Sequence, residues 1–159
     1  MNATPLEMSP DEALNLFTAT RSRTQVLAAP LCPEDMMLQS MEDASPVKWH
    51  LAHTTWFFEE FILKPRVADY RSPDDRFAVL FNSYYVQAGP RHARDKRGLV
   101  SRPDGGAVRD YRDHVESSLN DLMNASRDDS HEIAHLVELG CHHEMQHQEL
   151  LITDLLHGL

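Results

Sequence analysis

The chain has 159 residues, of which 42% are hydrophobic and 25% are charged, a composition typical of one globular domain with its own core. Its formal net charge of -10, from 25 acidic against 15 basic residues, argues against general binding to nucleic acid or to an anionic membrane. No run approaches the ~20 consecutive apolar residues that a membrane-spanning helix needs.

The N-terminus shows no basic segment followed by an apolar run, so we expect no secretory signal. Two cysteines, Cys32 and Cys141, are too few for a disulfide framework, and we expect a cytoplasmic protein with reduced thiols. Ten histidines is a high number for this length, and only some of them can be metal ligands.

The first predicted helix covers residues 9–29. Ser9 is a good N-cap, Pro10 suits the first helical position, and Glu12 completes a capping box. Apolar and small residues then continue at helical spacing until Pro30, which ends the pattern.

The second predicted helix covers residues 47–63. Ser45-Pro46 repeats the start signal of the first helix, and Lys64-Pro65 ends the pattern. The segment is rich in tryptophan and phenylalanine, which favours a buried core helix.

Residues 64–102 show no sustained period, and so long a connection in a compact domain is usually functional or disordered. Aromatic residues such as Tyr70, Phe77 and Phe81 argue against disorder. We therefore expect an ordered, irregular segment packed on the helices. It carries a cluster of basic residues: Arg91, Arg94, Lys96, Arg97 and Arg102.

Residues 104–106 are turn-like, and residues 108–123 then show a helical apolar stripe. A polar turn at 126–130 precedes a last helix at 131–157. The predicted face of that helix is broad: Ile133, Leu136, Leu139, His143, Gln146, His147, Leu150, Leu151 and Asp154. Four helices with one long crossover between the second and third predict an all-α four-helix bundle.

The last helix carries a pair of histidines one turn apart. His143 and His147 differ by about 40° around a helix, so both imidazoles can bind one metal ion. Glu149 lies about 200° from His147 and His142 about 100° from His143, so we expect neither on that face. The alternative is a pair of helical histidines that bind no metal.

A second pair, His50 and His53, lies in the second predicted helix. The two differ by about 60°, and geometry alone leaves open which of them would complete the site. Glu60 is two turns beyond His53, too far to be a ligand. Three neutral imidazoles leave coordination positions open, as a catalytic site requires, but they do not distinguish zinc, iron, nickel or copper.

Four segments resemble, in order, the N-terminal DinB-like domain of ergothioneine-biosynthesis sulfoxide synthases of the EgtB type. They read SPVKWHLAHTTWFFEEFIL, LFNSYYVQAGPRHARDKRGLVSRP, VRDYRDHV and HHEMQHQELLITDLLH. The resemblance covers residues 10–157, and its long, ordered motifs are much more specific than a histidine pair. It implies a DinB-like four-helix bundle.

The resemblance also implies a chemistry. Those enzymes use non-haem iron(II) and O2 to join a thiol to the imidazole of hercynine, forming a sulfoxide. Three histidines hold their iron, and the matching positions are His53, His143 and His147. The resemblance thus favours His53 over His50, and it implies Fe(2+) as cofactor, with zinc or another divalent metal as the alternative.

Substrate contacts are implied in the same way. Gln146 matches a glutamine that helps to hold the substrate imidazole. Arg94 and Arg97 match loop arginines that bind the carboxylates of the cysteine-type thiol, a role that gives the basic cluster a purpose in an acidic protein.

In that family the chain continues into a domain resembling formylglycine-generating enzymes, which supplies a catalytic tyrosine and much of the substrate pocket. This chain ends at Leu159, directly after the predicted metal helix. We therefore expect residues 1–159 to be one DinB-like domain, either part of a longer enzyme or a single-domain relative, and incomplete for full turnover. Two alternatives are a divalent-metal-dependent thiol S-transferase and a catalytically silent binding module.

Overall fold

The computed structural model describes residues 8–84, 87, 89–125 and 130–159. Two segments with a sequence prediction lie outside these ranges. They are residues 1–7, where no secretory signal was expected, and residues 126–129, which make up most of the predicted polar turn. All regular structure in the described residues is helical. No described helix has both the length and the apolar character needed to cross a membrane.

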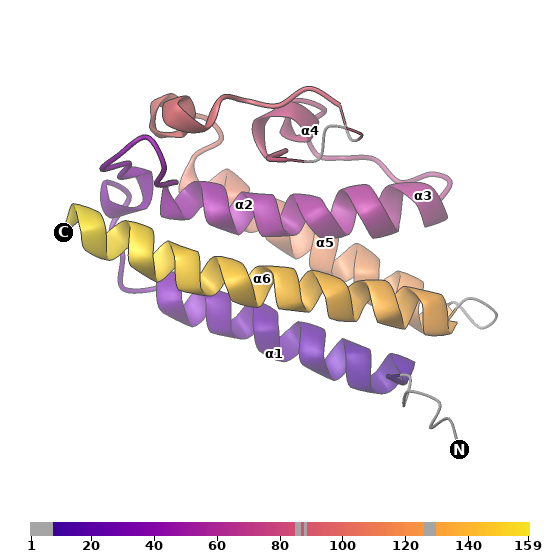
Figure 1. Ribbon diagram of the computed structural model, residues 1–159. Coiled ribbons are helices and arrows are strands. Elements are labelled where there is room, and N and C mark those ends of the chain that lie inside the picture. Colours follow the sequence, from indigo (N-terminus) through magenta and orange to yellow (C-terminus); the bar gives the residue numbers. More distant parts are fainter. Residues whose placement is uncertain (1–7, 85–86, 88, 126–129) are drawn as a thin grey trace, which may run out of the picture.

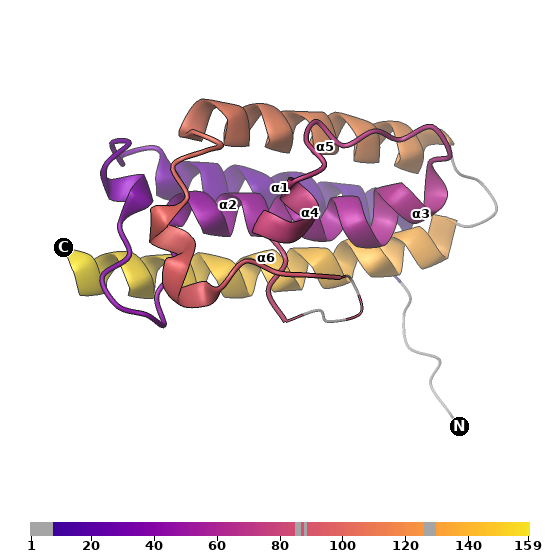
Figure 2. The same ribbon diagram turned by 90° about the horizontal axis from the view of Figure 1, so that it is seen from above.

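Four long rods form a bundle. They are α1 (Pro10–Ala28), α2 (Val47–Phe58) with its continuation, α5 (Gly105–Ala125) and α6 (Ser130–Gly158). The continuation of α2 is a π-helical turn, η2 (Glu59–Leu63), and a last helical turn, α3 (Lys64–Arg66). α6 packs against both α1 and α2, and α2 also packs against α5 (Figures 1 and 2). The predicted all-α four-helix bundle is confirmed.

The start of α1 follows the sequence prediction. The Ser9 hydroxyl accepts a hydrogen bond from the backbone N–H of Glu12 at 3.3 Å, and the Glu12 carboxylate accepts one from the Ser9 N–H at 2.9 Å. This is the predicted capping box, which satisfies two N–H groups at the helix start.

The second helix begins at Val47 as predicted, but its predicted cap and its predicted end are wrong. Ser45 does not cap α2, because its hydroxyl accepts a hydrogen bond from Arg97 at 2.8 Å and the N-cap position is Pro46. The helical path also continues through Pro65 to Arg66. Pro65 has no N–H to give to the Phe61 carbonyl, and the Arg66 side chain donates to that carbonyl instead, at 3.3 Å.

The third helix begins three residues earlier than predicted. The Asp104 carboxylate accepts a hydrogen bond from the Ala107 N–H at 2.9 Å, so residues 104–106 start α5 rather than form a separate turn.

The predicted face of the last helix is only partly the buried one. Ile133 and Leu151 are buried as predicted, but Leu139 is 50% exposed and Leu150 38% exposed. The reason is that α6 packs against two helices at once. Its buried residues are Ile133, Ala134, Val137, Gly140, Cys141, Glu144, Gln148 and Leu151.

The long segment between α2 and α5 is ordered, as predicted, over its described residues. It contains the short helices α4 (Phe77–Leu80) and η4 (Arg94–Leu99), and a third short helix, η1 (Asp35–Met37), precedes α2. Figure 2 shows the segment crossing over α2. Two side chains of α2 bind its backbone: Trp49 Nε1 donates to the Leu80 carbonyl at 3.1 Å, and Lys48 Nζ to the Val100 carbonyl at 2.9 Å.

Candidate metal centre

Three histidines meet between α2 and α6. His53 comes from α2, and His143 and His147 come from successive turns of α6. One ring nitrogen from each lies within 4.8 Å of the other two. The ring centroids are 5.0, 4.7 and 4.6 Å apart in the three pairs. The structure thus brings the three predicted histidines together, and the group can hold a divalent metal ion.

Hydrogen bonds fix two of these rings. His53 Nδ1 lies 2.5 Å from the Phe81 carbonyl oxygen, and His147 Nδ1 lies 2.9 Å from Nδ1 of His50. His143 Nδ1 is buried and has no hydrogen-bond partner among the described residues. Buried imidazole nitrogens normally have a partner, so an unsatisfied one in this group fits the place of a metal ion.

His53 lies within a column of flat groups. Its ring stacks on Trp49 at 4.4 Å between centroids with 13° between the planes, and on Trp56 at 5.6 Å and 15°. On Trp49 lies the guanidinium of Arg97, 3.4 Å from the ring centroid. Cation–π attraction and stacking therefore hold the ligand His53 between two rigid indoles.

Burial favours the neutral form of all three imidazoles. Desolvation, helped by the neighbouring imidazole His53, lowers the pKa of His147 far below its ordinary value. Desolvation also lowers the pKa of His143 to about 4, and the pKa of His53 falls well below its ordinary value. Neutral imidazole is the form that binds metals, so the group is ready for an ion at neutral pH.

The predicted imidazole-binding residue Gln146 is exposed and lies beside the triad. It lines a cavity of about 700 Å³ that opens between the second half of α2 and the first half of α6. The other residues that line it are half apolar and half polar or charged: Phe57, Phe61, Leu136 and Leu139 on one hand, and Arg66, Glu132, His142 and the triad residue His143 on the other. A substrate in this cavity would contact both Gln146 and a ring of the metal site.

Arg97 is buried on the other side of the triad. It is 5% exposed, and its Nη1 and Nη2 donate to the hydroxyls of Ser45 and Ser83 at 2.8 and 3.1 Å. Burial and the neighbouring cation Arg94 lower its pKa to about 10. It forms no ion pair with any described residue, and its Nε has no partner among them.

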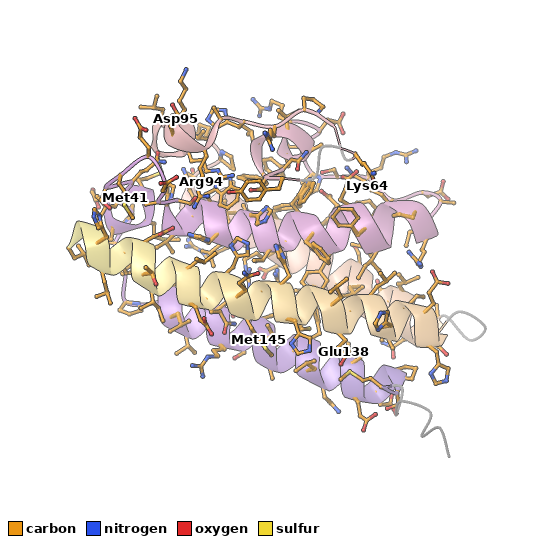
Figure 3. The ribbon with its side chains drawn as sticks, in the orientation of Figure 1. Met41, Lys64, Arg94, Asp95, Glu138 and Met145 are labelled. Carbon is orange, nitrogen blue, oxygen red and sulfur yellow. The ribbon has the colours of Figure 1, made fainter. Side chains whose placement is uncertain are left out.

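Arg94 lies next to Arg97 at the end of the bundle where α2 begins (Figure 3). Its guanidinium donates to the Tyr84 hydroxyl at 2.5 Å and to the Asp43 carbonyl. Its Nε is buried without a partner in the described part of the chain, and no described carboxylate pairs with it. Neither arginine therefore forms a direct ion pair in the described structure, although the negative charge of the Asp154 carboxylate acts on both.

Three acidic or histidine side chains near the motif stay away from the triad. Glu149 is exposed, and His142 is 63% exposed with Glu138 as its nearest acidic neighbour, at 3.9 Å. Glu60 pairs with Lys64 at 2.7 Å. Their positions agree with the predicted angles of Glu149 and His142 around the last helix and with the predicted distance of Glu60 from His53.

Glu144, which the sequence did not single out, is fully buried one residue after His143. Its carboxylate accepts hydrogen bonds from Arg21 at 2.9 Å, from Arg112 at 3.2 Å and from Thr24 at 2.6 Å. No pattern in the sequence marked it, because it lies outside the predicted buried face and its cationic partners lie on helices far away along the chain.

The comparisons with known proteins give a family and nothing narrower. The profile of the DinB superfamily matches residues 16–151, which is most of the chain. No curated protein matches it significantly.

Proposed function

The chain belongs to the DinB superfamily, whose members are often metal-dependent enzymes, and on this premise we propose that it is the iron-binding domain of an EgtB-type sulfoxide synthase. Such an enzyme joins a cysteine-type thiol to the imidazole of hercynine with O2. The observation that carries the proposal is the convergence of His53, His143 and His147 from two distant helices.

The three imidazoles would hold Fe(2+), and when bound the iron supplies the activation of O2 and the orientation of the thiol sulfur. A set of three histidines leaves coordination positions open for both. The residues of the chain keep the rings neutral by burial and fix His53 between Trp49 and Trp56.

Arg94 and Arg97 would bind the carboxylates of the thiol substrate. Their support is the absence of any ion pair to either residue in the described structure, together with an unsatisfied Nε on each. A buried guanidinium gains more from an anion than an exposed one does, because water screens the attraction less. Replacing either arginine should therefore raise the KM for the thiol.

Gln146 would position the imidazole of hercynine. It is exposed at the cavity next to His143, so its amide can donate to or accept from a ring nitrogen there. In the proposed family a formylglycine-generating-enzyme-like domain completes the pocket. Leu139 and Leu150, which are exposed and lie about 20° apart around α6, are compatible with such a covering partner.

The test begins with the metal. Protein loaded anaerobically with iron(II) should hold one ion per chain, and the triple variant His53→Ala, His143→Ala, His147→Ala should hold none. His135→Ala, which removes a 78% exposed histidine, is the matched control. A triple variant that keeps stoichiometric metal would contradict the assignment.

The reaction needs a separate measurement. O2 consumption that requires both hercynine and a cysteine-type thiol, in the domain or in a longer chain that contains it, supports the synthase. A second candidate is a divalent-metal-dependent thiol S-transferase, because three imidazoles suit zinc as well as iron. Transfer of a thiol to a simple electrophile without O2 would favour that enzyme, and metal binding with neither activity would favour a silent binding module.

A further inference from the structure

We propose that His50 and Asp154 form a positioning pair, which holds the ligand His147 in the tautomer that leaves its Nε2 free for a metal ion. The inference rests on the proposed metal site but on no particular reaction there. Neither His50 nor Asp154 belongs to the group of three ligands.

A chain of two hydrogen bonds connects Asp154 of α6 to His50 of α2, and His50 to His147 of α6. Asp154 Oδ2 lies 3.0 Å from His50 Nε2, and His50 Nδ1 lies 2.9 Å from His147 Nδ1. His50 is 3% exposed and the Asp154 side chain 10% exposed, so water competes little for these contacts. Asp154 is seven residues, about two helical turns, beyond His147 and therefore lies on the same side of α6.

The chemistry of the groups gives this chain of hydrogen bonds a direction. An ionised carboxylate only accepts, so the proton between Asp154 and His50 lies on His50 Nε2. A neutral imidazole protonated on Nε2 has Nδ1 as an acceptor, so the proton between the two histidines lies on His147 Nδ1. The lone pair of neutral His147 is then on Nε2.

Asp154 is itself fixed. The same oxygen, Oδ2, accepts a hydrogen bond from the backbone N–H of Ser45 at 2.8 Å. Ser45 directly precedes the N-cap of α2, the helix that packs against α6. The carboxylate is therefore held by the backbone and stays aimed at His50.

A different partner holds the ligand His53 in the same tautomer. The Phe81 carbonyl, 2.5 Å from His53 Nδ1, can only accept, so neutral His53 also has its lone pair on Nε2. Partners of this kind, a carboxylate or a backbone carbonyl beyond the ligand, orient metal-binding histidines and make them more basic. The positioning pair has this function for His147, with one imidazole interposed between the carboxylate and the ligand.

The direct test reads the tautomer in the unaltered protein. Long-range ¹H–¹⁵N correlation spectra of ¹⁵N-histidine-labelled, metal-free protein at neutral pH should show the proton of His147 on Nδ1. Addition of zinc(II), a diamagnetic probe, should shift its Nε2 resonance. A proton on Nε2 of His147 in the metal-free protein would overturn the proposal, whatever any variant does and whatever the reaction is.

Variants then measure the consequence. Cobalt(II) affinity, determined by competition with a chromophoric chelator, should fall about 10- to 100-fold in His50→Leu and in Asp154→Asn. His50→Asn retains an acceptor oxygen close to the position of Nδ1, so its cobalt(II) affinity should return most of the way from that of His50→Leu to that of the wild type. If His50 were needed only for packing, asparagine would not restore the affinity. His135→Ala should bind as the wild type does.

Two results for the variants would contradict the proposal. Wild-type cobalt affinity in His50→Leu would mean that the pair does not act on the ligand. A loss as complete as that of His147→Ala would make His50 a ligand. The visible spectrum of bound cobalt(II) distinguishes these cases, because it changes strongly when a nitrogen ligand is lost and only slightly when a ligand is reoriented.

Discussion

At Gly140, α6 lies so close to α2 that no side chain fits between them. A Cβ atom built there would be 2.4 Å from Cε1 of the buried Phe58 ring. Phe58 also packs edge-to-face on Phe17 of α1, at 4.9 Å, and cannot move away freely. The position therefore decides how closely the helix with two of the ligands approaches the helix with the third.

Gly140→Ala should lower the free energy of unfolding by about 1–3 kcal/mol, because overpacking of the core outweighs the ~1 kcal/mol that alanine gains over glycine in a helix. Urea unfolding measures the change. Gly105→Ala is the control, since its nearest atom would be 3.8 Å away and its stability should be unchanged or slightly higher. A Gly140→Ala protein as stable as the wild type would show that Phe58 yields without cost.

Single residues were predictable where one helix determined their surroundings. The period of 3.6 was enough to bring His143 and His147 together and to keep Glu149 away. The choice between His50 and His53 depended on how α2 is rotated toward α6, which no local pattern contains. The role of Ser45 as a hydrogen-bond partner of Arg97 depended on a segment 52 residues further along the chain.

At the scale of the elements, a buried network of ion pairs and hydrogen bonds joins all four helices. Glu144 of α6 accepts hydrogen bonds from Arg21 of α1 and from Arg112 of α5. The two arginines also donate to α2, Arg21 to the Thr55 hydroxyl at 3.0 Å and Arg112 to the Leu51 carbonyl at 3.2 Å. The network thus fixes the positions of the helices around the metal site.

Glu144→Gln should destabilise the fold by about 3–5 kcal/mol, because it removes the buried anion that Arg21 and Arg112 share and leaves them only the partly exposed Glu116. Chemical denaturation compares it with Glu132→Gln on the same helix. Glu132 is 68% exposed where it pairs with Arg66, and its loss should cost at most about 1 kcal/mol. Equal effects of the two substitutions would show that the buried network does not stabilise the bundle.

The same carboxylate predicts a dependence on pH. Desolvation raises the pKa of Glu144, but Arg21 and Arg112 outweigh it and bring the pKa to about 2, from an ordinary 4.5. Because the folded pKa is the lower one, the stabilisation is complete above about pH 4.5 and disappears as the pH falls toward 2. The difference in unfolding free energy between the wild type and Glu144→Gln should therefore shrink over this range, and a constant difference would contradict the assignment.

The buried face of α6 shows where prediction from an element ends. Leucines at helical spacing predicted a face that included Leu139 and Leu150, and both are exposed. The core instead receives Glu144 and Gln148, polar residues that become favourable inside only through partners on α1 and α5. The spacing of apolar residues predicted the helix correctly, but it predicted the wrong buried face because that face carries polar residues.

For the molecule as a whole, the order of helices was predictable and the arrangement around the site was not. Caps, prolines and apolar periods predicted four helices and an ordered crossover, which the described structure confirms. The relation of the basic segment to the triad arises from long-range contacts such as that of Arg97 with Trp49. The matching family profile, over residues 16–151, agrees with this architecture.

A metal ion bound to His53, His143 and His147 would connect α2 to α6 and so stabilise the folded molecule. At a free metal concentration 100 times the Kd, the expected gain is about 2.7 kcal/mol, or roughly 5–10 °C in Tm for a chain of this size. Thermal unfolding with zinc(II), then with a chelator in excess, measures the rise and its reversal. His147→Ala should show no such rise, and the same rise in that variant would place the ion elsewhere.

The column of flat groups around His53 has an optical consequence. Trp49 and Trp56 are the two tryptophans of the chain, and both stack on the same imidazole. All indole fluorescence of the protein therefore originates beside the proposed ligand. Binding of an open-shell ion such as cobalt(II) should quench this emission, whereas closed-shell zinc(II) should leave most of it. The native fluorescence alone therefore shows which kind of ion is bound.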